Sequence, residues 1–288
     1  MEQARKKTMI PGFFALKQHG KKFTMVTAYD YAFATKVNKT DIEMILVGDS
    51  AAMVMLGYPS TVPIDLDTMI ILAKAVVKGA PDTFIVGDMP FLSYEVSKEK
   101  AIENAGRLMK EAEVDCIKLE GGKRIADTVA AIVKAGIPVM GHIGLTPQSS
   151  SQLGGFRVQG KDLMAAEKIL ADALSLEEAG AFSIVLEGIP NPVAQIITER
   201  VDIPTIGIGA GPFCDGQVLV IHDLLGLFER FVPKFVKQYA QIGQDIVKAL
   251  SQFDKEVKTG LFPDKDHSYH LKEEMEKEII KYLNNKFD

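Results

Sequence analysis

Residues 44–49 read Met44-Ile45-Leu46-Val47-Gly48-Asp49, a short apolar run that ends in an acid. Three later runs have the same form: Phe84–Asp88, Cys116–Glu120 and Ser183–Glu187. Apolar runs of this length beside glycine or proline are typical of buried strands. Strands that each end in a carboxylate, in a chain that alternates strand and helix, indicate one ring of carboxylates around a shared pocket. A sheet closed into a barrel would present such a ring at one end.

The pattern of apolar runs predicts eight strands in all. They are expected at Thr24–Ala28, Met44–Gly48, Phe84–Gly87, Cys116–Leu119, Val139–His142, Ser183–Leu186, Thr205–Ile208 and Val218–His222. Helices are expected between most of them, at Asp65–Lys78, Ser97–Ala112, Lys123–Ala135, Ala165–Ala179 and Asn191–Arg200. This alternation favours a (β/α)8 TIM barrel over an open doubly wound sheet, which would usually need fewer strands or a second domain.

Residues 1–288 are expected to form a single barrel domain, with an N-terminal helical segment and a C-terminal helical extension at about 271–288. In that extension Leu271, Met275, Ile279 and Leu283 recur at every fourth position, which predicts a helix packed on the barrel or on a neighbouring subunit. The connection from Gly141 to Asp162 is long and polar, and such a loop is often functional, for example a lid.

Composition narrows the class of protein. The net charge of −5 shows no basic footprint for nucleic acid. No apolar run approaches the roughly 20 residues that span a bilayer, and no apolar stretch of signal-peptide length follows the first residues. Two cysteines make no disulfide framework, so a cytoplasmic protein is expected. Cys116 lies inside a predicted strand and is most simply a small core residue.

Asp49, Asp88 and Glu120 leave three successive predicted strands. In a barrel these strand ends would be neighbours, within reach of one ion. Mg²⁺ prefers oxygen ligands and often fills its octahedron with waters or substrate oxygens, so two or three carboxylates would suit it. Each acid taken alone is more often a helix cap or a loop residue. The set of three favours a metal site.

Lys118 lies two residues before Glu120, so both side chains point to the same side of the strand. A lysine inside a buried strand is rare unless it is paired. A carboxylate substrate could pair it, and a structural bridge to the neighbouring acids is about equally consistent with this placement. His142 ends the fifth predicted strand, where it is expected to donate a hydrogen bond to a substrate rather than to be a core histidine.

Glu187 ends the sixth predicted strand, away from the three acids of the metal site. This is the placement of a separate general base, which works best when desolvation raises its pKa. The segment Gly207-Ile208-Gly209-Ala210-Gly211 is not a dinucleotide fingerprint, because its third glycine is one position early and a strand follows. It indicates close backbone approach to a ligand, or only a tight turn.

These residues lie in motifs that resemble the ketopantoate hydroxymethyltransferase family. The motifs span roughly residues 8–270, in order: Val47–Ser50, Gly87–Phe91, Lys118–Gly122, Gly141–Gln148, Gly154–Gly160, Ile206–Gly211, Phe262-Pro263 and His267-Ser268. So many motifs in order are more specific than any single pattern.

The resemblance implies a (β/α)8 barrel of the phosphoenolpyruvate/pyruvate type. It also implies transfer of a hydroxymethyl group from 5,10-methylenetetrahydrofolate to 3-methyl-2-oxobutanoate. The product would be 2-dehydropantoate in pantothenate biosynthesis, formed through a Mg²⁺-stabilised enolate.

Site roles also follow from the resemblance. Asp49, Asp88 and Glu120 would hold Mg²⁺, and Asp49, Ser50, Asp88, Lys118 and His142 would contact the 2-oxo acid. Glu187 would be the base. The partners are then a small 2-oxo acid and a folate, with no nucleic acid or membrane, and the chain would form a homo-oligomer, for which the family suggests a decamer.

Two departures and two rival functions qualify the resemblance. Ala51-Ala52 stands where the family usually has Leu-Gly, and Pro59 is atypical.

A Mg²⁺-dependent carbon–carbon lyase or mutase would share the metal acids, but such enzymes commonly use a cysteine in a loop after a strand, and neither Cys116 nor Cys214 is so placed. A catalytically silent scaffold would not require all five of the residues Asp49, Asp88, Glu120, Lys118 and Glu187.

Overall fold

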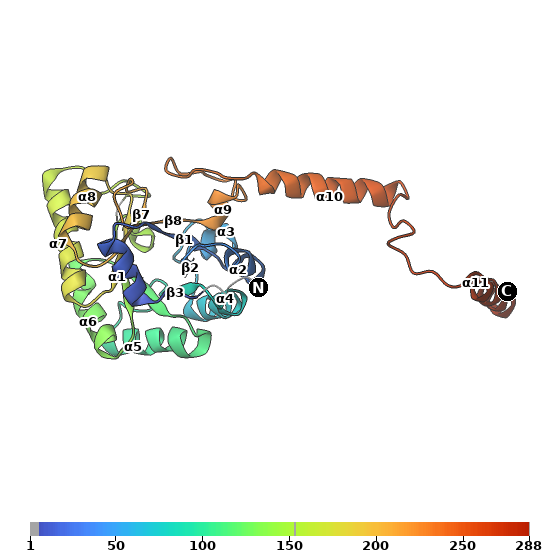
Figure 1. Cartoon of the computed structure of the whole chain (residues 1–288), viewed down its shortest axis with the longest axis horizontal. Helices are drawn as coiled ribbons and strands as arrows, with labels where there is room; N and C mark the ends of the chain where they lie inside the picture. Colours follow the sequence, from blue (N-terminus) through green and yellow to red (C-terminus); the bar gives the residue numbers. More distant parts are fainter. Residues whose placement is uncertain (1–5, 153, 288) are drawn as a thin grey trace. The chain divides into compact units, whose positions relative to one another are not determined.

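Eight parallel strands close into a barrel in the computed structural model of the chain, which describes residues 6–152 and 154–287 (Figure 1). Each strand pairs with the next along the chain, and the last pairs with the first. This confirms the predicted (β/α)8 barrel. The strands are β1 (Phe23–Thr27), β2 (Met44–Val47), β3 (Phe84–Asp88), β4 (Cys116–Glu120), β5 (Val139–Gly144), β6 (Ser183–Glu187), β7 (Thr205–Ile208) and β8 (Gly216–Leu219).

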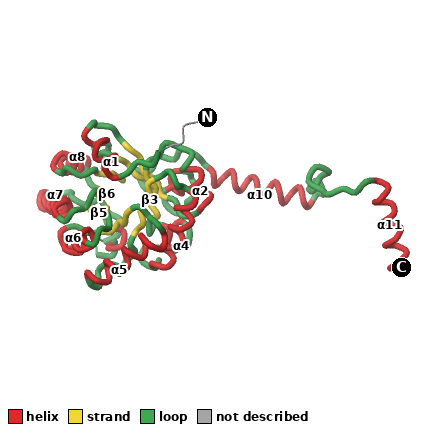
Figure 2. Tube along the Cα trace, turned by 60° about the horizontal axis from the view of Figure 1, so that its bottom comes forward, coloured by secondary structure: helices red, strands yellow, loops and turns green. Residues whose placement is uncertain are grey.

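Helices surround the strands in a ring (Figure 2). Four of them begin at an acid or serine whose side chain accepts a hydrogen bond from the backbone N–H three residues on: Asp30, Asp65, Ser97 and Asp162. The helices between β1 and α10 are α2 (Tyr31–Val37), α3 (Ala51–Val54), α4 (Leu66–Gly79), α5 (Lys98–Arg107), α6 (Ala126–Lys134), α7 (Leu163–Glu178), α8 (Asn191–Arg200) and α9 (Ile221–Leu224).

Alternation along each strand separates two apolar clusters. Ile45, Ile85, Ile117 and Ile184 face outward and pack with the helices. Met44, Phe84, Cys116 and Met140 face inward and fill the barrel. Helix α1 (Ile10–Gln18) adds Phe13 to the inner cluster, where its ring lies 5.2 Å from that of Phe23 and 5.4 Å from that of Phe84. The interior is therefore packed, and Cys116 is a core residue as predicted.

Several predicted boundaries were off by one to three residues, and three of the differences change the type of element. The eighth strand ends at Leu219, and His222 belongs to α9, which starts at Ile221. The helix predicted over Ser97–Ala112 changes to a π-helical turn at Leu108–Ala112, which ends at Glu113 with a φ of 60°. The helix predicted from Lys123 opens with a 3₁₀ turn, Lys123–Ile125. In each case the apolar pattern continues across the change, so it could not mark the boundary.

The described residues form two compact units, divided between Tyr239 and Ala240. The first holds the barrel. The second holds α10 (Ile242–Lys258) and α11 (Glu273–Phe287), so a helix is present in the extension expected at about 271–288. The assignment of one domain to the whole chain stays a prediction. None of the described helices is both long and apolar enough to cross a bilayer.

Candidate active site

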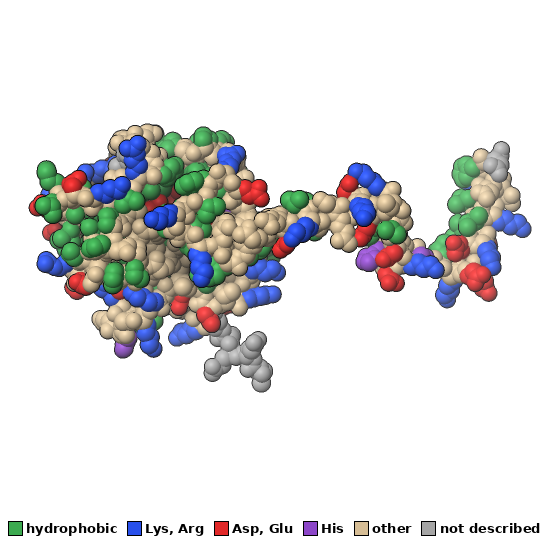
Figure 3. Space-filling view, turned by 90° about the horizontal axis from the view of Figure 1, so that it is seen from above, with side chains coloured by type: hydrophobic (Ala, Val, Ile, Leu, Met, Phe, Trp, Pro, Cys, Tyr) green, Lys and Arg blue, Asp and Glu red, His purple; other side chains and the backbone are tan. Residues whose placement is uncertain are grey.

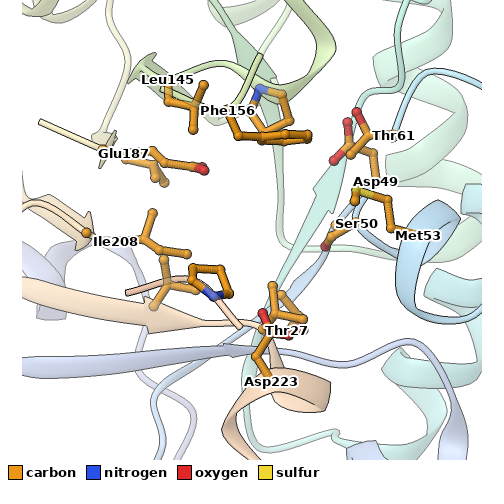
Figure 4. A pocket seen from close by; sticks show the side chains of 18 of the residues that line it. Thr27, Asp49, Ser50, Met53, Thr61, Leu145, Phe156, Glu187, Ile208 and Asp223 are labelled. Atoms are coloured by element: carbon orange, nitrogen blue, oxygen red, sulfur yellow. The ribbon is translucent and has the colours of Figure 1, made fainter. Parts of the chain in front are cut away.

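A cavity of about 390 Å³ opens at the carboxyl ends of the strands, where TIM-barrel sites are built. Figure 4 shows Glu187 on one wall and Asp49 and Ser50 on the opposite wall. All seven site residues predicted from the sequence line this cavity: Asp49, Ser50, Asp88, Lys118, Glu120, His142 and Glu187. The catalytic and binding roles of these residues stay predictions.

Strand register explains why these residues meet. Asp88 of β3 is paired with Lys118 of β4, and Glu120 of β4 is paired with His142 of β5. Glu187 of β6 is paired with Gly144, two residues beyond His142. Because alternate residues on one strand share a side, the inward-facing charged groups form a continuous arc from β3 to β6.

Lys118 forms a buried ion pair with Asp88. Its Nζ atom lies 2.9 Å from Asp88 Oδ1 and 3.9 Å from Glu120 Oε1, and the side chains are 3% and 1% exposed. Burial opposes the charged lysine, but Asp88 and Glu120 outweigh it and raise the pKa of Lys118. Lys118 is therefore a cation, and the bridge to acids that the sequence allowed is present.

Asp49 is a strongly perturbed carboxyl of the cavity. Its Oδ2 accepts a hydrogen bond from Gln148 Nε2 at 2.9 Å, and its backbone N–H donates to Asp88 Oδ2 at 3.0 Å. Burial and the charges of Asp88 and Glu120 raise the pKa of Asp49 to about 8. Burial also raises the pKa of Asp88, although Lys118 opposes that shift. Asp49 and Asp88 thus repel each other, and the positive charge of Lys118 does not cancel this repulsion.

His142 lies between two carboxylates. Its Nδ1 is 3.4 Å from Glu120 Oε1, its Nε2 is 3.2 Å from Glu187 Oε2, and Lys118 Nζ is 3.3 Å from Nδ1. Burial and the Lys118 charge oppose protonation, but the two carboxylates outweigh them and raise the pKa of His142 to about 9. The same contacts outweigh burial at Glu120 and lower its pKa. His142 therefore connects Glu187 to the arc of acids.

Asp49 and Asp88 fit a hard divalent cation in part. They are adjacent, buried and mutually repulsive, and Asp88 Oδ1 has no hydrogen bond of full geometry besides its ion pair. Within the described residues, no group of three His, Cys, Asp or Glu side chains converges as a ready metal site. Glu120 instead faces Lys118 and His142 and accepts the backbone N–H of Gln148 at 3.0 Å. Two carboxylates are enough for Mg²⁺ when water and substrate oxygens complete its shell.

Gln148 and Tyr94 hold the acids in place, and the sequence assigned neither a role. Gln148 Nε2 donates to Asp49 Oδ2 and to the Met89 carbonyl, and Gln148 Oε1 accepts from the Tyr94 hydroxyl at 2.7 Å. The Glu120 backbone N–H donates to the same hydroxyl. Gln148 belongs to the long polar connection from Gly141 to Asp162, which the sequence predicts to be functional. The length of that loop could therefore have pointed to Gln148.

Asp223 was also missed, although the signal used for the other acids was present. It directly follows the predicted strand Val218–His222, as Asp49 follows the predicted strand Met44–Gly48, and its side chain lines the same cavity. In the structure β8 ends at Leu219, so Asp223 reaches the cavity from α9 and not from the strand end itself.

Two loops of the cavity explain further sequence features. Gly209 has a φ of 62°, and a Cβ atom there would lie 2.7 Å from the ring of Phe235, so the glycine-rich segment provides both a turn and a close approach. The approach is to a side chain of the protein.

Ala51 and Ala52 are buried in α3, directly after Ser50, whose Oγ lies 2.8 Å from the Tyr29 hydroxyl.

Comparisons with known proteins agree with this site. The family model of ketopantoate hydroxymethyltransferase matches residues 7–265. A 3-methyl-2-oxobutanoate hydroxymethyltransferase of Heliobacterium modesticaldum is 59% identical over 270 residues, 94% of this chain and 98% of its own. One from Moorella thermoacetica is 56% identical over 265 residues, 92% of this chain and 98% of its own.

Solved structures support the fold. Phosphonopyruvate hydrolase, solved in complex with oxalate and Mg²⁺, superposes with a TM-score of 0.60 at 11% identity and covers 96% of both chains. A 2,3-dimethylmalate lyase of the PEP mutase/isocitrate lyase superfamily gives 0.59 at 14% identity, again over 96% of both chains. These likenesses support the barrel fold of the chain. With the family model covering most of its length, the chain belongs to the ketopantoate hydroxymethyltransferase family.

Proposed function

We propose that the chain transfers a hydroxymethyl group from 5,10-methylenetetrahydrofolate to 3-methyl-2-oxobutanoate, giving 2-dehydropantoate for pantothenate biosynthesis. The observation that carries the proposal is the meeting of paired acids, a buried lysine and a separate glutamate in one cavity. Relatives at 52–59% identity bear the name of this activity. One water supplies the oxygen of the new hydroxyl group, and tetrahydrofolate leaves.

Lys118 and Ser50 are proposed to bind the 2-oxo acid. A substrate carboxylate beside Lys118, whose side chain is buried, would form a charge-assisted hydrogen bond. Ser50 offers a hydroxyl that Tyr29 already orients. Asp49 and Asp88 would hold Mg²⁺, with Glu120 beside it as a third acid. When bound, Mg²⁺ would supply a Lewis acid that polarises the keto group and stabilises the enolate of the substrate.

Glu187 is proposed to remove the proton from the tertiary carbon next to the keto group. It approaches the cavity from the wall opposite Asp49, so it can face that carbon while the acids hold the other side (Figure 4). His142 would position Glu187 through the 3.2 Å contact and keep it apart from Glu120. Folate then carries the one-carbon unit, and the protein supplies alignment and charge.

The direct test supplies the purified chain with Mg²⁺, 3-methyl-2-oxobutanoate and 5,10-methylenetetrahydrofolate and follows 2-dehydropantoate by mass spectrometry. Product that depends on both substrates is expected. Proton exchange from the keto acid into solvent without folate separates the rivals. A silent scaffold would show neither product nor exchange, and a lyase or mutase would cleave or rearrange its 2-oxo acid without folate.

The metal ligands give the next prediction. Asp49→Ala and Asp88→Ala are expected to abolish turnover and to weaken Mg²⁺ binding, because these carboxylates are the proposed ligands. The fold should persist, since strand-end acids serve the site more than the core, but Asp88→Ala should lose stability because it leaves the buried Lys118 without its 2.9 Å partner. Calorimetric titration with Mg²⁺ in the presence of keto acid measures the binding, with Asp202→Asn at an exposed position as control. Unchanged Mg²⁺ affinity in both variants would remove them from the ligand set.

A homo-oligomer is also proposed, formed through the second unit. Helix α11 has no buried residue, yet Met275, Ile279, Ile280 and Leu283 give it an apolar side (Figure 3). Its first turn is acidic and its last turn carries Lys286. Two copies of α11 packed antiparallel would therefore bury their apolar sides and bring opposite charges together.

Substitutions on α11 test this interface. Ile279→Lys with Leu283→Lys is expected to reduce the molecular mass in solution, measured by light scattering after size exclusion. Asn284→Lys with Asn285→Lys adds the same charge to the polar side and should leave the mass unchanged. Equal masses for the two double variants would exclude α11 as an interface.

A cytoplasmic location is proposed as well, in keeping with two buried free cysteines.

A further inference from the structure

Asp223 is a buried acid on the cavity wall without a hydrogen-bond partner. It lies in α9, is 7% exposed, and its Oδ1 has no hydrogen bond within the described part of the chain. Figure 4 shows it beside Thr27, on a wall separate from those of Glu187 and Asp49. Burial raises the pKa of Asp223 to about 6. A buried acceptor left unpaired is costly, so its position on the wall of a cavity indicates a ligand that donates to it.

The 2-oxo acid cannot be that ligand. 3-Methyl-2-oxobutanoate has no N–H or O–H group at neutral pH, and its carboxylate would be repelled by Asp223. Its proposed position is beside Lys118 and Ser50. The donor must therefore belong to the other substrate. A reduced pterin carries two parallel N–H groups on one edge, from N3 and the 2-amino group, and such a pair matches the two oxygens of a carboxylate.

Aromatic side chains line the same cavity as Asp223 and suit a flat ring. Phe228, Phe231 and Phe235 line the same cavity. Their segment is tied to α9, because the backbone N–H groups of Leu227 and Phe228 donate to the His222 carbonyl at 2.8 and 3.3 Å. Ligand pockets commonly combine such apolar walls with a few polar groups that fix orientation.

We propose that Asp223 and the phenylalanines at 228, 231 and 235 form the subsite for the pterin ring of the folate, with Asp223 accepting the N–H groups of N3 and the 2-amino group. The inference rests on the proposed folate-dependent transfer. It names the residues that recognise the co-substrate and the wall of the cavity from which the one-carbon unit enters. The unpaired Oδ1 would then gain its partner only when folate is bound.

Asp223→Asn tests the subsite, because the amide keeps the shape and replaces one acceptor oxygen by a donor. The KM for 5,10-methylenetetrahydrofolate is expected to rise about 10- to 100-fold, the range for losing a hydrogen bond to a charged group. Folate-free proton exchange from the keto acid should change much less, which also reports that the variant is folded. Asp41→Asn, at an exposed position away from the cavity, is the matched control.

A ligand change completes the test. A folate analogue without the 2-amino group should be a poorer substrate than the parent for the wild type, and this difference should shrink in Asp223→Asn. Independent effects of the two changes, or an unchanged KM in the variant, would overturn the subsite. Absence of folate-dependent product in the wild type would instead refute the proposed function, so the two failures are distinguishable.

Discussion

Glu187→Gln is expected to slow proton exchange at the tertiary carbon of 3-methyl-2-oxobutanoate by about 10²–10⁴-fold, the usual contribution of a positioned general base. Glutamine keeps the shape of the side chain and removes its basicity. Since Glu187 lies on the wall opposite Asp49, the variant should still bind Mg²⁺ and the keto acid (Figure 4). Deuterium incorporation followed by NMR, without folate, measures this step alone.

The control for this experiment is Glu178→Gln, the same change at an exposed position near the end of α7. Its exchange rate should equal that of the wild type. Exchange at the wild-type rate in Glu187→Gln would mean that the base lies elsewhere. His142 would then be the first candidate, because the loss of the Glu187 charge removes one of the contacts that raise its pKa, and a metal-bound water the second.

Lys118→Met is expected to weaken binding of the keto acid by about 2–5 kcal/mol, the range for losing one partner of a buried charged pair. Methionine fills similar space without the charge. Because Lys118 also pairs with Asp88 at 2.9 Å, the variant should lose stability in addition, on the order of 3–5 kcal/mol. The dissociation constant comes from calorimetry with Mg²⁺ present, and stability from thermal unfolding.

A second variant separates the two roles of Lys118. Adding Asp88→Asn to Lys118→Met removes the unpaired buried charge, so most of the stability should return while the keto acid still binds weakly. Lys134→Met, at the exposed end of α6, is the control for the loss of a surface lysine. If Lys118→Met loses stability but binds the keto acid with wild-type affinity, Lys118 is a structural bridge only.

Much of the fold was predictable because it depends on local patterns. Apolar runs and the helices between them fixed eight strands in their order, and an acid at the end of a buried run placed Asp49, Asp88, Glu120 and Glu187 at one face of the barrel. Any parallel barrel brings these ends together, whatever the packing details. The motifs in order further identified the family.

Register and loop packing were decided only by the tertiary structure. That Asp88 lies beside Lys118, and that His142 lies between Glu120 and Glu187, follows from the stagger of neighbouring strands, which no spacing within one strand reveals. Gln148 reaches Asp49 across 99 positions of the chain. Asp223 lines the cavity from α9, since β8 ends at Leu219, three residues before the end that its apolar pattern indicated. The sequence by itself thus determined which groups are available at the barrel mouth. The tertiary structure decided their partners and their charges, and it left Asp223 Oδ1 without a hydrogen bond from the described residues, because hydrogen bonding and desolvation depend on neighbours distant in the chain.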